Sequence, residues 1–91
     1  MSRTERKLLG IVDRLARLRK ERGEVAAELE YHRHIHDDAV RDAVLVEDGF
    51  DKMEAGSTGA DVRRFSRRLE EIDRSIAELE ERRIALLQRL E

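Results

Sequence analysis

Apolar residues recur at alternating intervals of three and four along nearly the whole chain, and this pattern constrains the fold more than any other feature. With Leu8 as heptad position a, eleven of the fourteen a and d positions through Met53 are apolar. A second register, with Val62 at position a, has eight apolar residues at the nine seam positions through Leu90. Because such heptads are typical of coiled-coil helices, the sequence predicts an all-α fold.

Helix-capping and glycine signals predict where these helices begin and end. Ser2-Arg3-Thr4-Glu5 has the form of a capping box, and Gly56 suits the residue that follows a helix C-terminus. We predict one helix over about residues 2–54, a turn over about 55–58 and a second helix over about 59–91, forming a single antiparallel two-helix coiled-coil hairpin. In an alternative, the first helix ends near Glu47, beside Gly49, and a longer acidic loop follows.

The predicted turn leaves part of the first helix without a partner inside the chain. The second helix would end opposite Val25, and the apolar seam before that point would be uncovered. A lone two-helix hairpin also buries little apolar surface. We therefore expect a homodimer or a four-helix assembly; the alternative is that the uncovered seam binds a helix of another protein. The predicted partner interface consists of Leu8, Ile11, Leu15 and Leu18.

Histidines and a carboxylate share one helix face near the middle of the first helix. Glu28, His32 and His36 are spaced four residues apart, and the predicted register places Arg83 opposite His32. Three interpretations stay open: a polar layer that fixes the register, a metal site completed by a second chain, and an anion site. The candidate ligand or metal residues are Glu28, His32, His36, Arg83 and Arg33.

Charge is unevenly distributed, and it separates several classes of function. The acidic residues near the predicted turn form a candidate acidic tip: Asp37, Asp38, Asp42, Glu47, Asp48 and Asp51. Acids interleaved with the arginines of the second helix, and a net charge of −2, disfavour nucleic acid as a partner. The longest uncharged apolar run is only Ala43–Val46, so we expect no membrane span. The N-terminus lacks the apolar core of a signal peptide, and a cytoplasmic location is expected.

Two resemblances imply more specific activities. A coiled-coil hairpin with an acidic tip is similar to transcription-cleavage factors of the Gre type, which insert such a tip into RNA polymerase; this chain lacks that family's tip motif. Glu21 to Ala26, then Arg33, then Val40-Arg41-Asp42 resemble the first helix of small all-helical chorismate mutases. That resemblance implies that Arg22 and Arg33 grip substrate carboxylates, but Leu45-Val46 stand where the family has an Arg-Glu pair.

No set of nucleophile, base and orienting group is visible in the sequence, and it contains no Cys for thiol chemistry. We therefore expect a non-enzymatic coiled-coil module for protein–protein interaction, scaffolding or regulation, which self-associates. The alternatives are a small-ligand or metal-binding helical bundle with a site in the seam, including a chorismate-mutase-like enzyme, and an RNA polymerase-associated regulator with an acidic tip.

Overall fold

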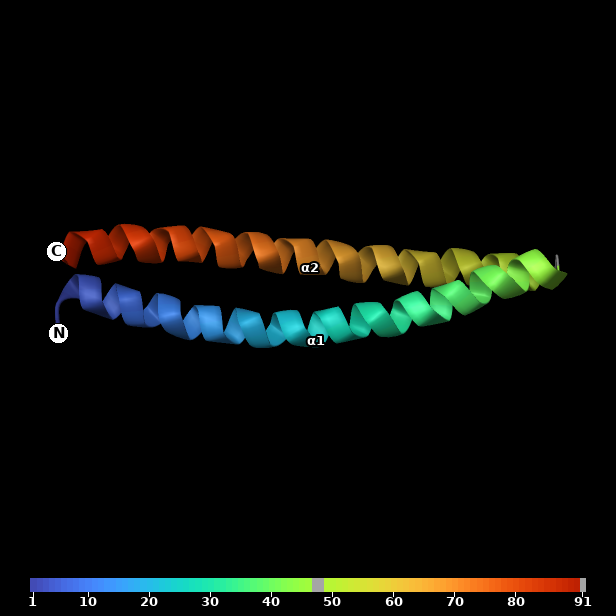
Figure 1. Cartoon of the computed structure of the whole chain (residues 1–91), viewed down its shortest axis with the longest axis horizontal. Helices are drawn as coiled ribbons and strands as arrows, with labels where there is room; N and C mark the ends of the chain where they lie inside the picture. Colours follow the sequence, from blue (N-terminus) through green and yellow to red (C-terminus); the bar gives the residue numbers. More distant parts are fainter. Residues whose placement is uncertain (47–48, 91) are drawn as a thin grey trace. The chain divides into compact units, whose positions relative to one another are not determined.

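The computed structural model describes residues 1–46 and 49–90, which form two α-helices, α1 (Arg3–Val46) and α2 (Gly49–Leu90). The helices run antiparallel and pack against each other, which confirms the predicted all-α hairpin (Figure 1). Contacts divide the chain into two compact units. We call Met1–Gly23 with Glu70–Glu91 the terminal unit, and Glu24–Leu69 the connection unit.

The start of α1 follows from the predicted capping box. The Ser2 hydroxyl accepts a hydrogen bond from the backbone N–H of Glu5 at 3.1 Å, and the Glu5 carboxylate accepts one from the Ser2 N–H at 3.2 Å. The Ser2 carbonyl accepts the next bond from the Arg6 N–H at 3.0 Å. These bonds satisfy backbone donors that the first helical turn leaves without a partner, so the predicted N-terminus is confirmed.

The predicted turn is in the wrong place. Residues 55–58 lie inside α2: α1 ends at Val46 and α2 begins at Gly49, and Glu47 and Asp48 lie outside the described residues. The alternative end of the first helix near Glu47 agrees with the observed end of α1 at Val46, but the longer acidic loop does not, because α2 already begins at Gly49. Asp51 then lies in the first turn of α2, where a negative charge suits the helix dipole.

The packing of α2 shows why residues 55–58 are helical. The second heptad register, continued backwards from Val62, places Ala55 and Thr58 in the seam; Thr58 is buried and Ala55 is half-buried. The first register would have placed Met53 in the seam, but Met53 is 76% exposed. Residues 55–58 of α2 therefore follow the heptad register that has Val62 at position a.

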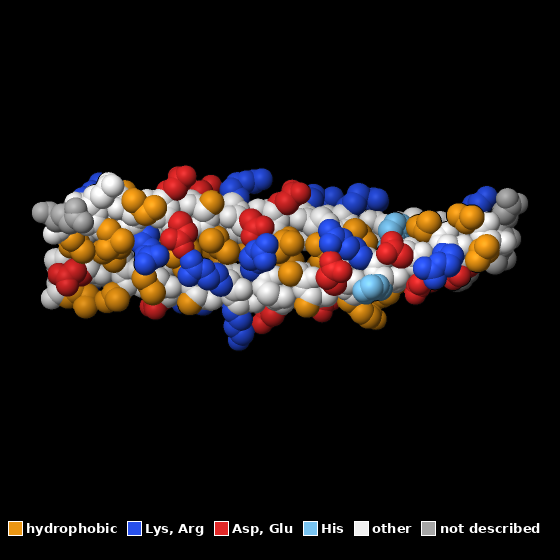
Figure 2. Space-filling model, viewed as in Figure 1, with side chains coloured by type: hydrophobic (Ala, Val, Ile, Leu, Met, Phe, Trp, Pro, Cys, Tyr) orange, Lys and Arg blue, Asp and Glu red, His pale blue; other side chains and the backbone are white. Residues whose placement is uncertain are grey.

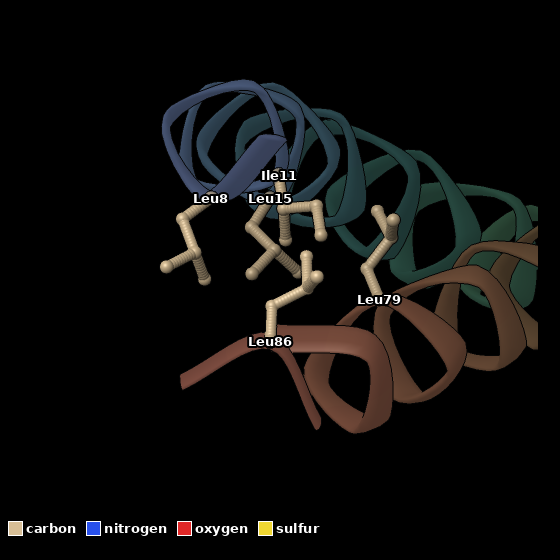
Figure 3. Packing of buried hydrophobic residues seen from close by; sticks show 5 residues of the cluster. All are labelled: Leu8, Ile11, Leu15, Leu79 and Leu86. Carbon is tan, nitrogen blue, oxygen red and sulfur yellow. The ribbon is translucent and has the colours of Figure 1, made fainter. Parts of the chain in front are cut away.

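The terminal unit holds the hydrophobic cluster that this register creates. Leu8, Ile11 and Leu15 of α1 pack against α2, and Leu18 and Ile76 border the cluster. Figure 3 shows these side chains of α1 directed towards Leu79 and Leu86. The expectation that the Leu8–Leu18 seam lacks a partner within the chain is therefore wrong. Because α2 begins ten residues earlier than predicted, its C-terminal part reaches that seam.

The connection unit has fewer large buried side chains. Leu29 and Ala39 of α1 are buried, and Val62, Phe65 and Leu69 of α2 are half-buried. Two histidines of α1 occupy seam positions that a coiled coil usually gives to aliphatic residues. These are His32, which contacts the aromatic ring of Phe65 on α2, and His36, which contacts the small residue Thr58 on α2.

Candidate functional site

His36 lies against a small-residue segment of α2. Its Nδ1 is 2.9 Å from the Thr58 hydroxyl oxygen, and the Thr58 hydroxyl donates to the Ala55 carbonyl at 3.1 Å. With the hydroxyl proton directed to the Ala55 carbonyl, the Thr58 oxygen is left to accept a bond from His36 in the tautomer that carries its proton on Nδ1. A Cβ added at Gly59 would lie 3.0 Å from His36 Cε1, so glycine at this position makes room for the imidazole ring.

His32 lies in an aromatic environment in the same unit. Its ring stacks on Phe65 with centroids 4.6 Å apart, and Tyr31 meets it edge-on at 5.4 Å. The Arg64 guanidinium lies over Phe65 at 5.1 Å. The Glu28 carboxylate is 3.7 Å from His32 Nε2. Through these contacts His32 lies in the seam between α1 and α2, with the face of its ring against the face of the Phe65 ring.

The structure does not bring the predicted ligand residues into one site. Glu28 and His32 are close, but His36 is bonded to Thr58. The predicted pairing of His32 with Arg83 is wrong: His32 faces Phe65, because the register follows the earlier turn. Within residues 1–46 and 49–90, no group of three His, Cys, Asp or Glu residues is arranged to hold a metal ion.

The arginines that the sequence placed in candidate sites pair with nearby carboxylates. Arg83 lies in the terminal unit and pairs with Glu80 at 3.3 Å, whereas Arg33 pairs with Glu30 at 2.8 Å on the exposed side of α1. Both contacts are between residues three apart on one helix. The geometry expected of an anion site shared by Arg83, His32 and Arg33 is therefore not present.

Arg22 occupies an a position but is exposed. Its Nε and Nη2 donate to the two carboxylate oxygens of Asp73 on α2, at 2.5 and 3.4 Å. The hydrogen bond with Asp73, together with its negative charge, raises the pKa of Arg22 above its usual value. The pair therefore favours the charged guanidinium at every pH below the ordinary arginine range, and this preference is lost only when the pH rises through the raised value.

The described members of the acidic tip lie on either side of the connection between the helices. Asp37, Asp38 and Asp42 are exposed on α1, and Asp51 is half-buried in the first turn of α2. Asp38 pairs with Arg41 at 3.4 Å. Glu47 and Asp48 lie outside the described residues.

The terminal unit has an exposed apolar surface that was not predicted from the sequence. Leu9 and Val12 on α1, and Ile84 and Leu87 on α2, are each between 43% and 55% exposed. We call these four residues the free-end face. All four occupy heptad positions b or e, which form a second apolar stripe beside the seam. That stripe was visible in the sequence, but only the a and d positions were considered.

Both helices contribute to one side of this surface. Arg19 and Glu80, both at e positions, form an ion pair across the helices. Val12 lies one heptad before Arg19, and Leu87 lies one heptad after Glu80. Since the helices are antiparallel, Val12 and Leu87 occupy the same relative place on the same side. Figure 2 shows hydrophobic side chains gathered over both helices at the end that holds the termini.

A shallow hollow adjoins the face at the start of α1, where Met1, Glu5, Leu8, Leu9 and Val12 line it.

Among the described residues, neither helix has a stretch that is long and apolar enough to cross a membrane. Comparison of the chain with models of known protein families, with curated proteins and with solved structures finds no match.

Proposed function

We propose that this chain is a non-enzymatic helical interaction module that self-associates through the free-end face. The observation that carries the proposal is the exposure of four large aliphatic side chains, from both helices, on one side of the terminal unit. Contiguous exposed apolar surface commonly marks a contact with another protein. The second stripe also extends the seam sideways, as a helix in a four-helix assembly requires.

The sequence-predicted interface is replaced in this proposal. Leu8, Ile11 and Leu15 are already buried inside the chain, so they hold the hairpin together and are not free to bind a partner. The free-end face lies beside this cluster at the same end of the two helices. Association there would cover apolar surface while leaving the internal seam intact.

The test compares the mass in solution of the wild type and of Val12→Gln/Leu87→Gln over a range of concentrations by sedimentation equilibrium. Glutamine keeps helix propensity and adds no charge, so the hairpin is retained while the face loses apolar area. A dimer would lose four half-exposed aliphatic side chains, each worth ~1 kcal/mol, and its association would therefore weaken about a thousandfold.

The control of matched composition is Val44→Gln/Leu45→Gln, which removes one Val and one Leu from the connection unit, where they are 71% and 74% exposed. We expect the wild type and the control to associate alike, and the free-end variant to be monomeric at the same concentrations. Circular dichroism checks that all three proteins are equally helical. A wild type that is monomeric throughout, or an oligomer that the free-end variant leaves unchanged, contradicts the proposal.

A further inference from the structure

The outer edges of the terminal unit carry opposite charges on the two helices. On α1, the edge beyond the free-end face holds Arg17 and Lys20; on α2, it holds Glu78 and Glu81, and all four are exposed. The wider segments have the same bias: residues 1–23 contain eight Lys or Arg and three acids, whereas residues 70–90 contain six acids and four Arg. The face is thus bordered by a basic edge and an acidic edge.

The ion pair between Arg19 and Glu80 shows which residues of α1 and α2 lie at the same height, that is, at the same distance along the helix axes of the terminal unit. Because the helices are antiparallel, a step towards the N-terminus on α1 matches a step towards the C-terminus on α2. Arg17 therefore lies close in height to Glu81, and Lys20 close in height to Glu78. Arg17 and Lys20 thus each have an acidic residue at a similar height on the other edge, although the α1 edge also holds Arg6 and Asp13 nearer its start.

We propose that the free-end face binds the same face of a second copy of this chain, related by a two-fold axis parallel to the helices. This inference rests on the proposed self-association and specifies its geometry. A two-fold interface uses the same patch on both copies. With the axis parallel to the helices, α1 of one copy lies on α2 of the second copy, and all neighbouring helices in the four-helix assembly are antiparallel.

Charge selects this axis over the other face-to-face arrangement. With the axis parallel to the helices, the basic edge of each copy meets the acidic edge of the other at matching heights, and Val12 meets the second copy's Leu87. A two-fold axis across the helices would place α1 on α1, with basic edges together and acidic edges together. Juxtaposed like charges disfavour that arrangement and leave the first one as the better fit.

The chain contains no Cys, so single introduced cysteines report the arrangement without background. Val12→Cys and Leu87→Cys are made as separate full-length variants, unfolded in urea either alone or as a mixture, and refolded. Each sample is then treated with a bismaleimide that is short enough to join only adjacent helices. We expect a cross-linked dimer in the mixture and none with either variant alone, because Val12 and the second copy's Val12 lie diagonally across the assembly.

Cross-linking of Val12→Cys with itself, stronger than in the mixture, indicates the axis across the helices and overturns the proposed geometry alone. An oligomer that gives no cross-link in any sample overturns both the geometry and the assignment of the free-end face as the contact, while self-association itself stands. If the wild type and both variants sediment as monomers, self-association itself fails, and the inference fails with it.

Discussion

Replacing Gly56 by Ala tests whether residues 55–58 are helical or form a turn. In the structure Gly56 is inside α2, and a Cβ at this position would meet no atom within 4 Å. An alanine in an exposed helix interior is more favourable than glycine by about 0.5–1 kcal/mol. Gly56→Ala should therefore raise the free energy of unfolding by that amount. In a turn that needs a left-handed glycine, the same change would lower it.

Gly59→Ala, three residues further along the same helix, has the same gain in helix propensity but meets His36. The new Cβ would lie 3.0 Å from His36 Cε1, so the ring must shift by a few tenths of an ångström, which strains its hydrogen bond with Thr58. Loss of that hydrogen bond costs about 0.5–1.5 kcal/mol. Gly59→Ala should therefore be less stable than Gly56→Ala, by an amount up to about this cost.

The assay is urea unfolding followed by far-ultraviolet circular dichroism, at one fixed protein concentration because association contributes to stability. Both glycine variants are also made in a His36→Ala background. Without the imidazole ring, the two alanines should stabilise the protein equally; the Arg63 guanidinium, 3.4 Å from the new Cβ, is the end of a flexible side chain and can move. A destabilising Gly56→Ala, or a difference between the glycines that survives removal of His36, would refute the reasoning.

Further substitutions probe the core, the seam and an ion pair. Leu15→Ala, at a side chain only 1% exposed, should cost about 2–5 kcal/mol in urea unfolding, whereas Leu45→Ala, at a residue 74% exposed, should change stability by less than about 0.5 kcal/mol. Thr58→Val removes the hydroxyl that His36 contacts and should cost about 1 kcal/mol, and Thr58→Ser should keep the hydrogen-bonded His36 resonance in NMR spectra. Arg22→Gln should lower the thermal midpoint slightly in low salt and not in high salt, because its ion pair is exposed and screened; a loss independent of salt would contradict this.

The helices and most of their seam could be predicted because apolar periodicity depends on neighbours a few residues apart. The heptads that begin at Leu8 and Val62 correctly identify buried residues in both helices, and the capping box at Ser2 forms as expected. These features are local, so the residues alone specify them. The same periodicity also contained the second apolar stripe, including Val12 and Leu87, which a count of a and d positions overlooks.

The position of the turn could not be obtained in the same way. The segment from Gly56 to Gly59 is rich in residues typical of turns. Whether this segment forms a turn or a helix depends on its contacts with α1. His36 packs over Gly59 and lies within hydrogen-bond distance of Thr58. These contacts join residues far apart in the sequence, and they are made by a segment that is helical although its residues have weak helix propensity. The error of the turn moved every cross-helix pair, so Arg83 was placed opposite His32 and the Leu8–Leu18 seam was left uncovered.

The register of α1 against α2 is the central feature of this structure, and the nuclear Overhauser effect between the rings of His32 and Phe65 measures it most directly. The rings stack with centroids 4.6 Å apart, and the chain has only three His, two Phe and one Tyr, so their signals can be assigned. We predict strong cross-peaks between the His32 imidazole protons and the Phe65 ring protons. A turn at residues 55–58 would instead place Phe65 opposite Phe50. Absence of the His32–Phe65 cross-peaks, together with cross-peaks between Phe65 and Phe50, would therefore contradict the register and support that turn.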